Sequence, residues 1–517
     1  MNPNQPSIFN DVIGPVMRGA SSSHCAAALR IGRLARSMMG GELTRVLIEF
    51  DARGSLATTH KSQGSDMGLF GGLLGWDLTD ERLLDYEAHM AASGIDLSIE
   101  INSFPTTSPN IYKLTLENSR GRHELIADSI GGGMIEVLSV NGAPLSMAGD
   151  CHQTLVFYDG DGAALAKQLG EHFPADGIFV HADSRLIEVK AHSFVGADIQ
   201  KQLRTDFPIR AWLELDQVLP VPSYPGTELP FTTCAQMLAF DDGRGRPLWE
   251  LAVDYECARG HLTRDEVFAQ MRGIVELLQD SVRIGLAGTD YEDRILGFQS
   301  GGFQELMAAG KLLAGGMLNE IILQVTAMME VKSSMGVIVA APTAGACGAL
   351  PGAVLGAGTV LGSSVDEMTE AMLAAGMIGV FIATHSTFAA EKAGCQAECG
   401  AGSGMGAAAL VHLAGGNLNQ SIAAASMALQ NMLGLICDPI AKRVEAPCLG
   451  RNVLGASNAF SSANMAVANF DQIIPLDEVI DAMDAIGKTM PCELRCTGLG
   501  GLATTPTSLK IESELQS

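Results

Sequence analysis

The stretch from about residue 230 to residue 517 constrains the fold most, because it shows almost no alternation of apolar and polar residues. Alternation with a period of two is the mark of a half-buried strand. This stretch is instead rich in Ala, Leu, Met and Glu, with Gly and Pro as breaks. We therefore expect residues 230–517 to form an all-helical domain with a very apolar interior.

The first 150 residues have a mixed pattern. The segments 44–50, 111–118 and 134–140 are predicted strands, because β-branched and apolar residues dominate them. The segment 22–39 is a predicted helix, since its apolar residues recur every three or four positions. Residues 1–150 are therefore expected to form an α/β domain.

The next zone, residues 152–222, alternates short strands and helices. Their order is βαββαβ, which is typical of a small open-faced sandwich. Residues 219–230 (LPVPSYPGTELP) are rich in Pro and Gly and are interpreted as a linker. The fold class that follows is a multidomain α+β protein.

Charge and cysteine content exclude several classes of function. The net charge is −25 without a basic patch, so we expect neither nucleic acid nor an anionic membrane as a partner. The most apolar stretches are broken by Pro and Gly before they reach the ~20 residues of a membrane span. No secretory signal opens the sequence. Eleven cysteines, an odd number, argue against a disulfide framework and favour a cytoplasmic protein.

The helical zone is rich in thiols and poor in imidazoles. Seven of its cysteines lie within 150 residues: Cys347, Cys395, Cys399, Cys437, Cys448, Cys492 and Cys496. Such surroundings favour an iron–sulfur cluster or zinc, although a buried cysteine is equally often a small hydrophobic residue. Cys437 precedes Asp-Pro and Cys448 follows Pro447, so both thiols are predicted at helix ends, where backbone N–H groups are free.

Polar residues also begin the first predicted helix. Ser21, Ser22, Ser23 and His24 lie at its N-terminus, where hydroxyls, N–H groups and the positive end of the helix dipole suit a carboxylate. The alternative is an ordinary serine cap.

Long runs of the sequence, in matching order, resemble the iron–sulfur-dependent L-serine dehydratases that carry an ACT-like domain. The runs include SIFNDVIGPVMRGASSSHCAAALRIGRLAR, KSQGSDMGLFGGLLG, SIGGGMIEVLSVNGAPL, APTAGACGALPG, AGCQAE, NMLGLICDPIAKRVEAPCLGRNVLGASNA, DEVIDAM and GGLATTPT. The resemblance implies a serine dehydratase beta-type domain over 1–150, an ACT-like domain over 152–222 and an alpha-type domain over 230–517 that binds the cluster.

The resemblance implies a [4Fe-4S] cluster held by Cys395, Cys437 and Cys448, which match the family's GCQAE, CDP and APC motifs. Cys399 and the other cysteines of the zone lie outside that ligand set. Three thiolates would leave one iron open, as catalytic zinc sites keep one position open. An open iron can act as a Lewis acid toward a hydroxyl group.

The remaining site residues are also implied by matched segments. The catalytic candidates are His24, His60 and Lys61. The substrate-binding candidates are Ser21, Ser22, Ser23, Ser65, Asp66, Ser129, Gly131, Gly132 and Asn458.

The implied function is β-elimination of water from a small hydroxy amino acid, by default L-serine to pyruvate and ammonia, without pyridoxal phosphate. The alternatives are the same elimination from cysteine, threonine or a hydroxy dicarboxylate, a zinc protein, or a non-catalytic paralogue that senses amino acids. The partner is a small-molecule substrate, and the apolar helical domain predicts a homodimer or larger homo-oligomer.

Three segments depart from the family pattern. Gln63 replaces a histidine, the loop 293–302 replaces a glycine-rich loop, and within 384–392 Glu391 and Lys392 replace small neutral residues. A glutamine is no general base near neutral pH, so either His24 or His60 takes that role or the substrate differs. Glu391 and Lys392 could pair with each other, meet a charged substrate group, or form a solvated pair near a helix end.

Overall fold

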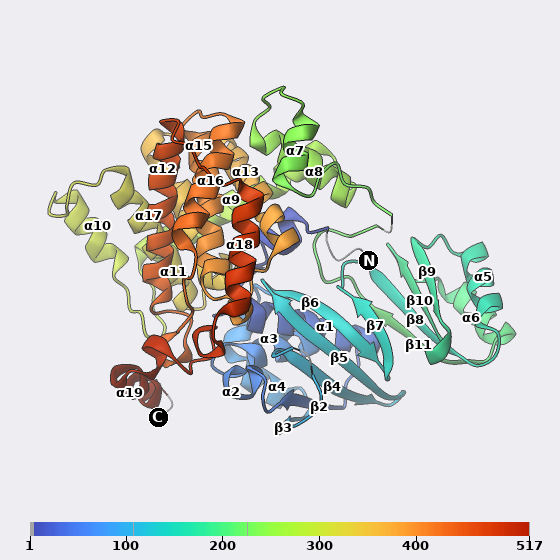
Figure 1. Cartoon of the computed structure of the whole chain (residues 1–517). Coiled ribbons are helices and arrows are strands. Elements are labelled where there is room, and N and C mark those ends of the chain that lie inside the picture. Colours follow the sequence, from blue (N-terminus) through green and yellow to red (C-terminus); the bar gives the residue numbers. More distant parts are fainter. Residues whose placement is uncertain (1–4, 107, 225, 516–517) are drawn as a thin grey trace.

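The computed structural model describes residues 5–515 except 107 and 225, the second of which lies in the predicted linker. The helices of the C-terminal half form one body, a six-stranded sheet lies beneath them, and a four-stranded sheet forms a lobe at the side (Figure 1).

The six-stranded sheet has the order β3-β2-β4-β5-β6-β7, and only the pair β2–β3 is parallel. In the predicted strand β2, Val46, Ile48 and Phe50 are fully buried on one face of the sheet. The helices α1 and α3 pack closely on each other beside the sheet. The bounds are α1 (Ala27–Met38), β2 (Arg45–Asp51), α2 (Leu56–Thr59), α3 (Ser65–Leu74), α4 (Tyr86–Ala92), β3 (Asp96–Asn102), β4 (Ile111–Asn118), β5 (Gly121–Gly131), β6 (Met134–Val140) and β7 (Ala143–Met147).

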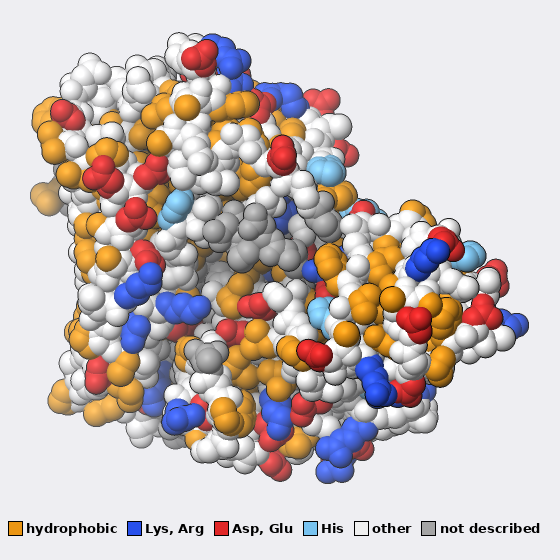
Figure 2. All heavy atoms as spheres, turned by 45° about the vertical axis from the view of Figure 1, so that its right-hand side comes forward, with side chains coloured by type: hydrophobic (Ala, Val, Ile, Leu, Met, Phe, Trp, Pro, Cys, Tyr) orange, Lys and Arg blue, Asp and Glu red, His pale blue; other side chains and the backbone are white. Residues whose placement is uncertain are grey.

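The side lobe has the predicted βαββαβ order of elements. Its antiparallel sheet has the strand order β11-β8-β10-β9. The edge strand β9 exposes Phe179 and Val180, and Figure 2 shows hydrophobic side chains gathered on this lobe. The bounds are β8 (His152–Tyr158), α5 (Gly162–His172), β9 (Gly177–His181), β10 (Leu186–Ala191), α6 (Ala197–Asp206) and β11 (Ile209–Leu215).

The C-terminal zone is helical, as predicted, except for the two-residue strand β12 (Ile338–Val339), which pairs with β1 (Val16–Met17). Capping boxes begin α9, α13 and α16. The helices are α7 (Cys234–Asp241), α8 (Leu248–Gly260), α9 (Arg264–Ala287), α10 (Ser300–Ala308), α11 (Met317–Ser333), α12 (Ala349–Leu361), α13 (Val365–His385), α14 (Ala390–Ala393), α15 (Ala401–Leu413), α16 (Leu418–Met432), α17 (Cys448–Val467), α18 (Leu476–Thr489) and α19 (Pro506–Leu515).

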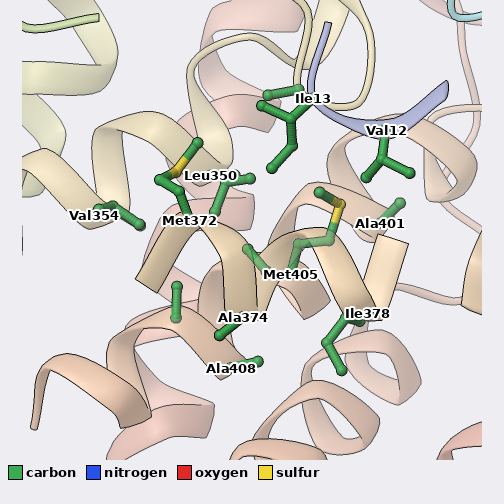
Figure 3. Close-up of a cluster of buried hydrophobic side chains, with 14 of the residues drawn as sticks. Val12, Ile13, Leu350, Val354, Met372, Ala374, Ile378, Ala401, Met405 and Ala408 are labelled. Atoms are coloured by element: carbon green, nitrogen blue, oxygen red, sulfur yellow. The ribbon is translucent and has the colours of Figure 1, made fainter. Parts of the chain in front are cut away.

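The helical core includes residues from the start of the chain. Figure 3 shows Val12 and Ile13 beside side chains of α12, α13 and α15. The turn η1 (Ile8–Val12) is anchored there, since the backbone N–H of Ile8 donates to the buried carboxylate of Glu256 at 2.8 Å. The predicted boundaries at 150 and 230 stay predictions, and this N-terminal turn belongs spatially to the helical body.

Two segments of this core, 344–361 and 365–385, are long and apolar enough to cross a membrane by length and composition. They are 83% and 78% buried inside the protein, respectively, which is typical of core helices. Their apolar surfaces are therefore used in packing against neighbouring helices.

Candidate metal centre

Three buried thiols come from three segments of the helical zone. Cys395 precedes the π-helical turn η6 (Gln396–Gly400), which continues into α15, and Cys448 is the first residue of α17. The prediction that Cys437 lies at a helix end is wrong. This residue lies in an extended segment that bridges to Arg495. Two of the three thiols thus sit at helix N-termini, where the dipole favours negative charge.

Two of the three thiols, Cys395 and Cys437, lie close enough to share a ligand. Ligand atoms of Cys395, Glu398 and Cys437 all lie within 4.8 Å of one another, and Cys395 Sγ is 3.8 Å from Glu398 Oε2. Cys448 interacts electrostatically with both Cys395 and Cys399. The side chains of Cys395, Cys437 and Cys448 are at most 4% exposed, so water is largely excluded from this thiol group.

Cys395 is the most acidic member of the thiol group. Hydrogen bonds from the thiols of Cys399 and Cys437 lower its pKa well below the usual range, and Arg451 lowers it further. Arg451 Nη1 lies 3.6 Å from Cys395 Sγ, and the same guanidinium pairs with the buried carboxylate of Asp438. A thiolate is the form of cysteine that binds metals.

Two further thiols belong to this neighbourhood, although the resemblance places both outside the ligand set. Cys399 is hydrogen-bonded to Cys395, and Cys496 to Cys437. The backbone N–H of Cys496 also donates to the carbonyl of Cys437 at 2.9 Å. No spacing rule in the sequence indicates Cys496, because the pairing with the 437 segment is purely tertiary.

Two ionisable side chains, Glu398 and Lys332, flank the thiols. Burial, followed by the nearby Cys395 and Glu391, raises the pKa of Glu398 well above its usual value, and Thr343 Oγ1 donates to its Oε1 at 2.8 Å. Lys332 of α11 is 1% exposed and is attracted to Glu398 and Cys448. Its Nζ has no hydrogen-bond partner within the described residues.

The serine-rich loop of the N-terminal domain lies against this centre. The residues 22–26 form a second π-helical turn, η2, a feature that is common at functional sites. Ser22 Oγ accepts the N–H of Ala344 at 3.2 Å, next to the Thr343 that binds Glu398. The loop and the thiol group are thus joined through one short segment.

His24 is the buried imidazole of this loop. Its Nδ1 lies 3.1 Å from Ser21 Oγ, and its Nε2 lies 3.2 Å from Thr59 Oγ1. Burial lowers its pKa to about 4, so the ring is neutral at neutral pH. The carboxylate of Glu391 lies 3.9 Å from Nδ1 and is hydrogen-bonded with Ser23.

The SIGGG turn, residues 129–133, packs against the serine-rich loop. Ser129 Oγ donates to the carbonyl of Ser23 at 2.6 Å. Gly131 has a φ of +105°, and a Cβ built there would lie 2.8 Å from the Cβ of Ala389. A side chain does not fit at Gly131, so the backbone itself contacts the segment that leads to Cys395. Gly132 lies beside Pro342.

The KSQGSD segment, residues 61–66, has buried side chains on one side and the exposed Lys61 on the other. His60 Nδ1 lies 2.8 Å from Asp66, and Ser65 Oγ accepts from the Tyr112 hydroxyl at 2.9 Å. Lys61 is mostly exposed and pairs with Glu87 at 3.0 Å. The structure thus places Lys61 away from the buried thiols, at the rim of a cavity of about 450 Å³. Tyr86, Tyr291, Asp293, Lys442, Arg443 and Glu512 also line this cavity.

Asn458 lies apart from the serine-rich loop. Its amide nitrogen donates to Ser403 Oγ and to the carbonyl of Ala428, and its oxygen accepts from Asn431. These bonds tie α15, α16 and α17 together, which is a packing role. Asn452 on the same helix lies nearer the thiols, since its amide nitrogen donates to the carbonyl of Cys448 at 2.8 Å.

Residues 293–302, one of the three segments that depart from the family pattern, also contact this region. The predicted loop ends at residue 299, because residues 300–302 belong to α10. The N–H groups of Ile295 and Leu296 donate to Glu445 Oε2 at 2.9 and 3.0 Å. Glu445 is buried three residues before Cys448. The loop is therefore fastened to the segment between two of the thiols.

The comparisons with known proteins agree with this arrangement. The family model described as the serine dehydratase alpha chain matches residues 243–503. The probable L-serine dehydratase alpha chain of Bacillus subtilis is 41% identical over 253 residues, which is 49% of this chain and 84% of that protein. The chain belongs to the iron–sulfur L-serine dehydratase family.

Two other similar proteins extend the comparison beyond the alpha chain: one aligns with nearly the whole sequence, and the other is a beta chain. L-serine dehydratase 1 of Escherichia coli is 26% identical over 503 residues, covering 94% of this chain and 96% of that protein. The probable L-serine dehydratase beta chain of Bacillus subtilis is 42% identical over 153 residues, 30% of this chain and 68% of that protein. The chain thus resembles both an alpha chain and a beta chain of the family.

The residues present fit a thiolate-bound metal cofactor, on which the family depends. The donors are sulfur, they are buried, two begin helices, and Arg451 supplies a counter-charge. Carboxylates alone would favour a hard cation such as Mg²⁺.

The low pKa of His24 predicts a pH dependence of stability. Between pH 6.5 and about 4 the unfolded chain binds a proton that the folded chain does not, so folding loses stability as the pH falls through this window. The loss amounts to about 3 kcal/mol. The midpoint of urea unfolding of the wild type should decrease between pH 7 and pH 4.5. In the variant His24→Gln we expect a smaller decrease, because the buried imidazole is absent. An equal fall in both proteins would contradict the neutral buried imidazole.

Proposed function

We propose that this protein is a lyase that converts L-serine to pyruvate and ammonia, with a [4Fe-4S] cluster held by Cys395, Cys437 and Cys448. The observation that carries the proposal is a buried thiol group beside the Ser21–His24 loop. In this group Cys395 and Cys437 lie within reach of one ion, and Cys448 interacts electrostatically with Cys395. The names of the similar proteins support the substrate.

The reaction removes the α-proton and the β-hydroxyl of serine. When bound, the cluster supplies a Lewis-acidic iron that assists departure of the hydroxyl as hydroxide. The α-proton goes to a base of the protein, and the C–H electron pair forms the double bond of 2-aminoacrylate. This product tautomerises to the imine, and water hydrolyses it to pyruvate and ammonia without pyridoxal phosphate.

The base is assigned to His24, because burial keeps its imidazole neutral and because it faces Glu391 near the thiols. Thr59 and Ser21 hold the ring from either side. The substrate contacts are assigned to the surrounding loops: Ser22 and Ser23, the backbone of Gly131 and Gly132, and Ser129. The cavity lined by Lys61 is assigned as the access path. His60, Ser65 and Asp66 belong to the same segment of the chain as Lys61 and are assigned to substrate binding from that side.

Anaerobic turnover tests the reaction. The reconstituted protein is offered L-serine, L-threonine, L-cysteine and β-hydroxy dicarboxylates, and the keto-acid products are identified. We expect pyruvate from L-serine at the highest kcat/KM. Consumption of another acid without pyruvate from L-serine would overturn the substrate, and no turnover of any would favour the amino-acid-sensing alternative.

A single metal ion is a second candidate, because Cys395, Glu398 and Cys437 already lie within reach of one ion. Zinc bound by these residues would be colourless. Metal analysis of anaerobically purified protein separates the candidates: about four irons with matching sulfide support the cluster, and one zinc per chain supports the single ion.

The βαββαβ domain is assigned as an ACT-like module that joins subunits in a cytoplasmic homodimer or larger assembly. Phe179 and Val180 on its edge strand support this role, since an exposed apolar edge favours pairing. Light scattering after gel filtration measures the assembly, and a monomer at micromolar concentration would contradict it.

A further inference from the structure

The segment before Cys395 carries a buried carboxylate that the reaction as described does not use. Glu391 belongs to α14, and its side chain is only 6% exposed. Its Oε2 is buried and accepts no hydrogen bond from the described residues. Burying an acceptor without a partner costs free energy, which indicates that Oε2 has a partner when a ligand is bound.

Among the residues that the structure describes, none supplies a paired cation for Glu391. His24 is 3.9 Å away and is kept neutral by burial. Lys392 is exposed, and its charge affects the pKa of Glu391 less than burial and a backbone hydrogen bond do. Arg451 pairs with Asp438 and Cys395. The solvated Glu391–Lys392 pair that the sequence allowed is therefore wrong for Glu391.

Glu391 also occupies the junction between the two halves of the site. On one side it contacts Ser23 and lies near His24, and on the other it interacts with Cys395. A cation held there lies beside both the proposed base and the proposed cluster.

We propose that Glu391 binds the α-ammonium group of the substrate and thereby selects an amino acid over a hydroxy acid. The inference rests on the proposed function for its reaction, but it concerns binding. An ammonium group donates three hydrogen bonds, and a buried carboxylate is its strongest partner. The bond to Ser23 orients the carboxylate and leaves Oε2 for the ligand.

Glu391→Gln tests the inference, because glutamine keeps the shape of the side chain and removes its charge. Calorimetry on the reconstituted protein, without turnover, measures the binding of L-alanine and propionate, which differ in the α-ammonium. We expect the variant to bind L-alanine about 10- to 100-fold more weakly, with propionate unchanged. Lys392→Gln is the matched control and should bind both ligands like the wild type.

The outcomes separate this inference from the reaction. Equal weakening of both ligands, or of neither, would overturn the role of Glu391 even if L-serine is turned over. Loss of iron from the variant would place Glu391 in cofactor binding and also overturn it. Loss of the preference for L-alanine supports the inference, whether or not the wild type produces pyruvate.

Discussion

Replacement of Cys395, Cys437 or Cys448 by serine is expected to remove the visible absorbance of the cluster and to reduce pyruvate formation to background. A serine hydroxyl stays protonated near neutral pH and is a poor iron ligand, whereas Cys395 has a lowered pKa and is ready to bind. Loss of a residue that only supports a ligand costs about 10–100-fold, so loss of a ligand should cost more. Iron content, sulfide content and the absorption spectrum are measured after anaerobic reconstitution.

Cys399→Ser and Cys496→Ser are the matched controls, because both thiols are buried and hydrogen-bonded to a proposed ligand. We expect both variants to retain iron and colour. If one of them loses the cluster while a proposed ligand variant keeps it, the assignment of ligands is wrong. The two control thiols are buried like the three proposed ligands, so a difference between the variants cannot come from burial alone.

Replacement of Arg451 by methionine is expected to destabilise the protein by about 3–5 kcal/mol, because it leaves a buried carboxylate without its partner. Asp438 is 3% exposed in its side chain and would retain the N–H of Leu502 as a donor, at 2.7 Å. The same change removes a cation from Cys395, so its pKa should rise and iron binding should weaken.

The double variant Asp438→Asn/Arg451→Met is the control for this prediction. It removes both charges, and we expect it to unfold at a higher urea concentration than Arg451→Met alone. Iron binding should stay weak in the double variant, because the cation beside Cys395 is still missing. A single variant as stable as the wild type would contradict the buried ion pair.

Local patterns predicted most of the fold. The apolar and β-branched residues of 44–50 and 111–118 correspond to β2 and β4, and the βαββαβ order of the middle zone is confirmed. Long-range pairing was not predictable in this way. The strand β1 pairs with β12 more than 300 residues later, and Val12 and Ile13 enter the helical core, because these contacts depend on how whole domains dock.

The site shows the same division. The matched motifs brought forward Cys395, Cys437, Cys448 and His24, and their roles stay predictions. In the structure Cys395 and Cys437 lie within reach of one ion, and His24 lies near Glu391, which interacts electrostatically with Cys395. Arg451 was within reach of sequence reasoning, since it follows Cys448 by three residues on one helix face. Lys332 and Cys496 were not, because α11 and the 496 segment reach the thiols only through tertiary packing.

The most direct test of the account is Mössbauer spectroscopy of the protein reconstituted with ⁵⁷Fe, with and without L-serine. We predict about four irons per chain in one cluster, with one iron distinct from the other three and its signal alone shifted by L-serine, as three thiolate ligands require. Four equivalent irons that do not respond to L-serine, or a protein that binds zinc in place of iron, would contradict the account.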